Sequence, residues 1–288
     1  MVAKVTLQEF PPNSLALLRF SLASLLLAPF FLAETKKVKI KVEDLPYLVG
    51  VGVTIITLNI AFFFAGITRT TAINGSVLTL IITILSVVLS WIFLKETIYF
   101  INIAGVILGL LGALVILGLP QILIGIGNFS AEAFLGNLFI ILASVSFVVG
   151  AILSRKMLKK YPSLIVTGVA FLTGVAAFII PALNEYLHDP AWPNRISMLG
   201  AFGLLYMALL SSISAYFLFE WGLAKTSVVA ADLFQYIEPL IAVSLGILVL
   251  GESIGNLYIV GSSLIILGMF LGTFAKEKHH RIHKYHRH

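Results

Sequence analysis

The sequence has no cysteine and few charged residues. The absence of cysteine excludes a disulfide framework and any thiolate metal site. Only 11% of the 288 residues are Asp, Glu, Lys or Arg, whereas a soluble domain carries about 25%. In water, a chain with so few charges would expose large hydrophobic patches. An ordinary soluble domain is therefore excluded as well.

Hydrophobic residues dominate what is present. They make up 59% of the chain, and the mean hydropathy is +1.05. A helix needs about 20 apolar residues to cross a bilayer. Open strands cannot satisfy their backbone in lipid, so all spans are expected to be helices and the fold an all-α integral membrane protein. The hydrophobic runs predict nine spans, near residues 14–33, 45–66, 72–94, 101–118, 133–153, 163–182, 198–221, 229–249 and 257–275.

Part of the sequence recurs 156 positions further on. The matches pair Arg69 with Lys225, Glu96 with Glu252, Gly105 with Gly261 and Gly112 with Gly268. A repeat with an odd number of helices inverts its second copy, which is typical of secondary transporters. We therefore predict a first repeat at 1–118, a linker at 119–132, a second repeat at 133–275 and a basic tail at 276–288.

The start of the chain resembles the end of the span at 133–153. At an offset of 151, Lys4 matches Arg155, Phe10 matches Tyr161 and Pro11 matches Pro162. We interpret residues 1–10 as the end of a first helix whose body is missing. The full arrangement would then be a ten-helix bundle of two inverted five-helix repeats, with nine spans present. A true nine-helix protein is the alternative.

Positive charge is unevenly divided between the two sets of loops. Most of the 19 lysines and arginines fall in one set and in the tail, whereas the opposite loops hold Lys4, Arg69 and Arg195. Basic loops stay on the cytoplasmic side, which predicts a cytoplasmic C-terminus in a plasma-membrane protein. The net charge of +6 predicts an interaction of the basic residues with anionic lipid, not with nucleic acid. Gly105, Gly109 and Gly112 share one helix face, and Gly261, Gly268 and Gly272 share another. These glycine faces predict tight helix contact, within the monomer or in a homodimer.

One face of the span at 72–94 is polar. Ser76, Thr79, Thr83, Ser86 and Ser90 share it, and the equivalent residues of the second copy are Asp232, Gln235, Pro239, Ala242 and Gly246. A face that is polar or small in both copies predicts a substrate cavity between the repeats. Close helix packing is the alternative.

Glu238 is the strongest single candidate for a residue that takes part in transport, because it lies near the middle of its span. A carboxyl there suits proton coupling or a cationic substrate, and the alternative is a paired structural glutamate. Asn59 and Tyr216 are further cavity candidates. The nearby Ser211, Ser212 and Ser214 are candidates as well, with packing as the alternative for these serines. Arg19 is expected to snorkel in a structural role, and Glu220 to lie at the lipid headgroups.

Several segments resemble a known family. They are Pro11-Pro12-Asn13-Ser14-Leu15-Ala16-Leu17-Leu18-Arg19-Phe20, Thr226-Ser227-Val228-Val229-Ala230-Ala231, Tyr236-Ile237-Glu238-Pro239 and Leu250-Gly251-Glu252-Ser253. The pattern resembles the EamA branch of the drug/metabolite transporter (DMT) superfamily over roughly residues 11–275. The resemblance implies two five-helix repeats and movement of small organic solutes. It departs at the missing first helix and at Thr83, which stands where the second copy has Pro239.

The function expected is secondary active transport, with export of small organic metabolites or drug-like solutes by alternating access. A non-transporting membrane scaffold is the alternative. An enzyme is not expected, because no histidine lies in a predicted span and no nucleotide motif is present. We therefore predict no catalytic residue, no cofactor and no metal site. The histidines of the tail lack the fixed geometry that a metal site needs.

Overall fold

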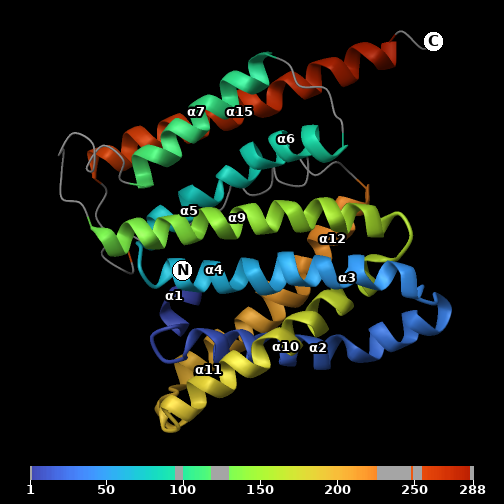
Figure 1. Ribbon diagram of the computed structural model, residues 1–288, viewed down its shortest axis with the longest axis vertical. Helices are drawn as coiled ribbons and strands as arrows, with labels where there is room; N and C mark the ends of the chain where they lie inside the picture. Colours follow the sequence, from blue (N-terminus) through green and yellow to red (C-terminus); the bar gives the residue numbers. More distant parts are fainter. Residues whose placement is uncertain (1, 95–99, 118–129, 226–247, 249–254, 286–288) are drawn as a thin grey trace. The chain divides into compact units, whose positions relative to one another are not determined.

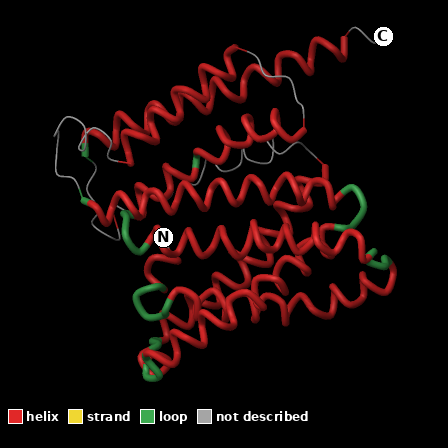
Figure 2. The backbone as a smooth tube through the Cα atoms, in the orientation of Figure 1, coloured by secondary structure: helices red, strands yellow, loops and turns green. Residues whose placement is uncertain are grey.

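A computed structural model describes residues 2–94, 100–117, 130–225, 248 and 255–285 (Figure 1). Regular structure in these ranges is helical throughout, with short connecting loops (Figure 2). The chain divides into two compact units. Unit 1 is Met1–Thr68 with Ser146–Ala231, and unit 2 is Arg69–Val145 with Asp232–His288. Each unit therefore takes helices from both predicted repeats.

Among the described residues, six helical segments are long and apolar enough to cross a membrane. They are Pro12–Lys37, Val42–Ile67, Ala72–Phe93, Ala131–Leu158, Ser163–His188 and Met198–Lys225. Two shorter apolar stretches, Ile103–Ile116 and Asn256–Gly268, fall on two more of the predicted spans. The span at 229–249 lies outside the described residues apart from 248. The all-helical, membrane-spanning class is confirmed, and the count of nine stays a prediction.

Unit 1 is built around two long helices that run side by side. Its elements are α1 (Val2–Thr6), α2 (Pro12–Lys37), η1 (Val42–Asp44), α3 (Leu45–Val51), η2 (Gly52–Leu58), α4 (Asn59–Ile67), the C-terminal half of α9 (Ala131–Leu158), α10 (Ser163–His188), η3 (Trp192–Arg195), α11 (Met198–Ala208), η4 (Leu209–Ser214) and α12 (Ala215–Lys225). α2 packs along α10 in the opposite direction, as contacts at both of their ends show. The core between them includes the fully buried Phe20, Ile56 and Phe171.

Unit 2 contains α5 (Ala72–Thr79), α6 (Ile81–Leu94), α7 (Phe100–Leu117), the N-terminal half of α9 and α15 (Asn256–Tyr285). α7 and α15 approach each other along the predicted glycine faces. A Cβ added to Gly268 would come within 2.5 Å of the Gly105 carbonyl oxygen, and one added to Gly112 would come as close to that of Gly261. Close backbone approach of this kind is open to glycine alone. The glycines therefore serve packing within the chain.

Local geometry recurs at the offsets that the sequence matches predict. Before α2, the amides of Glu9 and Phe10 both donate to the Thr6 carbonyl. Before α10, 151 residues later, the amides of Lys160 and Tyr161 both donate to the Met157 carbonyl. The π-helical stretch η2 covers residues 52–58, and η4 covers 209–214, which is close to a shift of 156. The two copies thus share these details, while their inverted relation as whole repeats stays a prediction.

Candidate functional site

A buried arginine occupies the middle of unit 1. Arg19 on α2 is 4% exposed. Its Nε donates to the Ser212 hydroxyl at 2.5 Å, and its Nη2 donates to the Ser211 carbonyl at 2.8 Å and to the Ser211 hydroxyl at 3.3 Å. No described carboxylate forms an ion pair with it. The expectation that Arg19 snorkels is wrong, because its polar partners lie inside the unit.

The π-helical stretch η4 makes these partners available. A π-turn widens the helix and displaces carbonyl groups from the regular pattern, and such turns are frequent at functional sites. The Ser212 hydroxyl donates to the Met207 carbonyl at 2.9 Å, five residues earlier, so its lone pair is left for Arg19. The Ser214 hydroxyl likewise donates to the Leu209 carbonyl at 3.1 Å. Because η4 departs from the α-helical pattern, it can present both a carbonyl and hydroxyl groups to the guanidinium.

Polar side chains continue from η4 along α12. Ser212, Tyr216 and Glu220 are spaced by four, which puts them on one side of the helix. The Tyr216 ring lies against Phe20 and Phe171, with centroids 6.4 and 5.8 Å away. Glu220 is 2% exposed and accepts a hydrogen bond from the Ser154 hydroxyl of α9. We call Arg19, Ser211, Ser212, Tyr216, Glu220 and Ser154 the polar row.

The polar row places a permanent cation and a carboxyl inside helices that are apolar enough to span a membrane. Ionisable groups at such positions are costly, and they usually mark the path of a substrate or ion. Glu220 is buried within unit 1, and its expected level at the lipid headgroups stays a prediction. It is buried because Ser154, 66 residues away in the chain, supplies a hydrogen bond for its carboxyl group.

At one end of unit 1, Glu9 holds the start of α11. Its carboxylate accepts from the backbone amide and the hydroxyl of Ser197, each at 2.7 Å. These two hydrogen bonds, the amide's first, hold the pKa of Glu9 below the ordinary glutamate value. The neighbouring Phe10 packs on Trp192, with ring centroids 5.7 Å apart. We call the Glu9–Ser197 contact the first latch.

At the same end, Glu185 near the C-terminus of α10 caps the start of α2. One carboxylate oxygen accepts from the amide and the side chain of Asn13 at 3.0 and 2.7 Å. The other accepts from the amide and the hydroxyl of Ser14 at 2.7 and 2.8 Å. A carboxylate at a helix N-terminus satisfies free amides and suits the helix dipole. The end of α10 is thereby tied to the start of α2.

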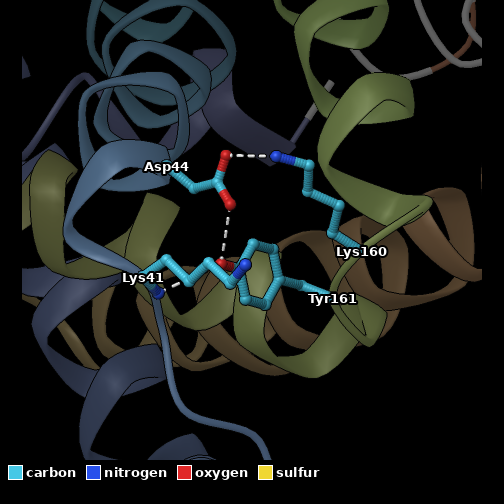
Figure 3. Close-up of polar contacts among 4 residues, drawn as sticks. All are labelled: Lys41, Asp44, Lys160 and Tyr161. Atoms are coloured by element: carbon cyan, nitrogen blue, oxygen red, sulfur yellow. Dashed lines mark hydrogen bonds and ion pairs between the residues drawn. The ribbon is translucent and has the colours of Figure 1, made fainter.

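At the opposite end of unit 1, Asp44 holds the turn before α10 (Figure 3). It accepts from Lys160 Nζ at 2.5 Å and from the Tyr161 hydroxyl at 2.9 Å. The Tyr161 oxygen in turn accepts from the Lys41 amide at 3.1 Å. The hydrogen bond to Asp44 raises the pKa of Lys160 above the ordinary lysine value. We call this cluster the second latch.

The two latches occupy equivalent positions in the chain. Glu9 and Lys160 are related by the offset of 151, and each contacts the N-cap residue of an α-helix. Ser197 precedes α11, and Asp44 precedes α3. The chemistry differs, because a carboxylate meets a helix N-terminus in the first latch and an ammonium meets a carboxylate in the second.

The sequence candidates are spread over the chain. Glu238, Gln235 and Asp232 lie outside the described residues, as do Glu96 and Glu252. In unit 2, the Thr79 hydroxyl donates to the Ser76 carbonyl at 2.7 Å, at the end of α5. Thr83 lies on α6, and its side chain is outside the described part.

The other two candidates lie in unit 1, each directly after a π-helical stretch. The half-buried Asn59 follows η2, and Tyr216 lies in the first turn after η4. Of the sequence candidates, the structure brings Tyr216 into the polar row. The structure also brings in Ser211 and Ser212, which the sequence named as cavity candidates with packing as the alternative. The residues that sequence reasoning missed are Ser154 and Glu220. The spacing of four from Ser212 to Glu220 was the one signal available.

Helices that span a membrane, with ionisable groups buried among them, define the class as a multi-pass membrane protein, and its relatives are transporters. An uncharacterized transporter of Clostridium kluyveri is 26% identical over 93% of this chain and 85% of its own length. An uncharacterized transporter of Archaeoglobus fulgidus is 28% identical over 94% of this chain and 90% of its own. A crystal structure with 18% identity superposes with a TM-score of 0.65, covering 96% of this chain and 92% of that one, and so supports the fold.

Residues 1–118 and 134–274 match the EamA-like transporter family. The chain belongs to this family, and the resemblance predicted from its sequence is confirmed. A general role in transport follows from the family and from its relatives. That role agrees with the expectation that the protein is not an enzyme.

Proposed function

We propose that the protein is a secondary active transporter that exports small organic metabolites or drug-like solutes across the plasma membrane by alternating access. One observation carries the proposal. Four members of the polar row, Arg19, Ser154, Ser212 and Glu220, are buried in unit 1. The two latches lie at opposite ends of α2 and α10. A transporter needs a polar site that each side of the membrane reaches in turn.

The latches suit this cycle because each can release without the other. Releasing the first latch frees the turn before α2 from α11, and releasing the second frees the turn before α10 from α3. Lys160 and Glu9 are accessible to water, where ion pairs and hydrogen bonds are weak. Contacts of this strength can break and re-form within a transport cycle.

The proposed orientation places the second latch and the C-terminal tail in the cytoplasm. Lys41, Lys156 and Lys160 gather at that end of unit 1, and Lys156 lies over the Tyr47 ring at 4.3 Å. Lys4 in α1 and Arg195 in η3 belong to the first-latch end. This division agrees with the rule that basic loops stay inside.

For coupling, we propose Glu238 as the titrating carboxyl. Gln235, Asp232, Thr79, Thr83 and Asn59 are proposed as further substrate contacts. Bilayer lipid is the proposed surrounding partner. A homodimer is proposed from the glycine-containing helix faces. None of these roles requires a cofactor or a nucleic acid.

The test is a flux measurement on the full chain in proteoliposomes. Solid-supported-membrane electrophysiology, with a panel of amino acids, nucleotides and organic cations, would detect charge movement with and without a pH gradient. We expect a subset of the panel to give currents, and Glu238→Gln to abolish or uncouple them. Glu34→Gln is the matched control, since Glu34 only pairs with Lys37 on the same helix.

Two outcomes would contradict the proposal. If folded protein gives no current and no counterflow with any compound, the scaffold alternative is favoured. If Glu238→Gln keeps wild-type flux and pH dependence, Glu238 is a structural residue.

A further inference from the structure

We propose that the polar row binds the oxyanion of a small organic acid, with Arg19 Nη1 and the Tyr216 hydroxyl as the donors. This inference rests on the proposed function, because it assigns the substrate an acid group.

The donors of Arg19 are only partly used. A guanidinium has five N–H groups in a planar fork. Nε donates to Ser212, and the two N–H groups of Nη2 have Ser211 acceptors. Within the described chain, Nη1 donates to no residue, although Arg19 is 4% exposed. Two adjacent donors are therefore held in place without an acceptor.

Among the described residues, no carboxylate balances the charge of Arg19. Its three acceptors are a carbonyl and two hydroxyl groups, which are all neutral. Glu220, the carboxyl of the same row, is held by Ser154 and forms no ion pair with Arg19. Arginine does not release its proton in proteins, so the site cannot become neutral by titration. Within the part of the chain that the structure describes, an incoming anion is the way to balance this charge.

Tyr216 supplies a second donor near the guanidinium, because Arg19 and Tyr216 both lie against the Phe20 ring. Its hydroxyl forms no hydrogen bond with a described residue, and its ring packs edge-on against Phe20 and Phe171. The guanidinium carbon of Arg19 lies 5.0 Å from the centre of the Phe20 ring. Aromatic walls lower the local dielectric and so strengthen the attraction between an oxyanion and these donors. A carboxylate or phosphate on a compact, partly apolar body fits this chemistry.

Arg19 could instead serve only to brace η4. The two roles make different predictions for Tyr216, because its hydroxyl has no part in bracing. They also differ for lysine at position 19, which keeps the charge but loses the planar fork.

The experiment measures binding of simple probes to the purified full chain in nanodiscs. The acids are acetate, benzoate, phenyl phosphate and inorganic phosphate, and the neutral partners are acetamide, benzamide and phenol. Isothermal calorimetry gives the dissociation constants, and thermal unfolding shows whether each variant is folded. We expect benzoate or phenyl phosphate to bind while its neutral partner does not.

Variants locate the site. Tyr216→Phe should weaken binding of the acid about tenfold, the loss of one hydrogen bond to a charged group. Arg19→Lys should weaken it further, and Arg19→Gln should abolish it. Arg155→Gln, outside the row, should leave it unchanged. If Arg19→Gln does not fold, Tyr216→Phe and Arg19→Lys decide the question.

The inference is overturned if no acid binds in preference to its neutral partner, or if acid binding survives in both Tyr216→Phe and Arg19→Lys. Flux separates this result from the proposed function. Transport of cations or neutral solutes without acid binding overturns the inference alone, and acid binding without any flux overturns the transport proposal alone.

Discussion

Four hydrogen bonds converge on the single carboxylate of Glu185. Replacement by Gln turns one oxygen into an amide donor, so the two hydrogen bonds from Ser14 or those from Asn13 are lost. We expect Glu185→Gln to lower the free energy of unfolding by about 1–2 kcal/mol, the usual cost of a lost helix cap. Thermal unfolding in detergent measures it. Glu34→Gln removes an exposed intrahelical pair, and the cap interpretation fails if it destabilises as much.

Glu9 makes the first latch sensitive to acid. A lowered pKa means that its contribution to stability is full above the ordinary glutamate pKa and is lost as pH falls through the lowered value. Trp192 reports on this loss, since it packs on Phe10. With Trp91 and Trp221 replaced by Phe, acidification should shift the Trp192 emission to the red. Glu9→Gln should be red-shifted throughout, with no such step.

The control for this titration is the ion pair of the same loop, between Asp189 and Arg195. Asp189→Asn should keep the acid step. If that variant abolishes the step and Glu9→Gln does not, the titrating group is Asp189.

At the scale of the elements, the second latch joins the start of α3 to the start of α10. The pKa of Lys160 is raised, so this contribution is full below the ordinary lysine pKa and is lost as pH rises through the raised value. Lys160→Met mimics that loss at neutral pH. Because the chain has no native cysteine, Met157→Cys provides a buried reporter.

Thiol labelling of Met157→Cys should be slow in the parent chain and severalfold faster with Lys160→Met, because the turn before α10 is released. Lys159→Met is the matched control, as Lys159 is exposed and adjacent but takes no part in the latch. If both variants accelerated labelling equally, the positive charge at this end of unit 1, and not the latch, would govern access of the reagent to residue 157.

The contact of α7 with α15 depends on glycine. A Cβ at Gly268 would meet the backbone of Gly105 and Gly109, which cannot rotate away as a side chain can. Overpacking of this kind costs about 1–3 kcal/mol, and we expect Gly268→Ala to lower the unfolding temperature accordingly. Among the described residues, no atom lies within 4 Å of a Cβ added to Gly222, so Gly222→Ala should be neutral or slightly stabilising. The reverse order would refute close backbone packing.

At the scale of the whole molecule, orientation follows from the uneven basic charge of the loops. A reporter fused after His288 should be active in the cytoplasm. A cysteine placed in the loop 188–193 should react with an impermeant thiol reagent added outside intact cells. An external reporter, or a loop protected outside and labelled only in inverted vesicles, would reverse the assignment and place the second latch outside.

The hydrophobic runs of the sequence were enough to predict where the membrane-spanning helices lie. A stretch of about 20 apolar residues must be helical in lipid, since its backbone has no other partner there. The described helices therefore fall on the predicted spans, and α2 and α10 begin directly after Pro11 and Pro162. The repeat at an offset of 156 and the family motifs likewise needed no coordinates.

The polar row was decided only by tertiary structure. Arg19 meets Ser211 and Ser212 across more than 190 positions, and Glu220 meets Ser154 across 66. In a hydropathy profile, each of these residues is a single polar position in an apolar run. Such a profile describes one helix at a time and carries no information about which helix packs beside it. The π-turn that exposes the Ser211 carbonyl also breaks the 3.6-residue period on which such patterns depend. Packing between helices decides which partners a buried polar side chain meets. The sequence alone could therefore name Tyr216 as a candidate, but it could not place Tyr216 and Arg19 against the same Phe20 ring.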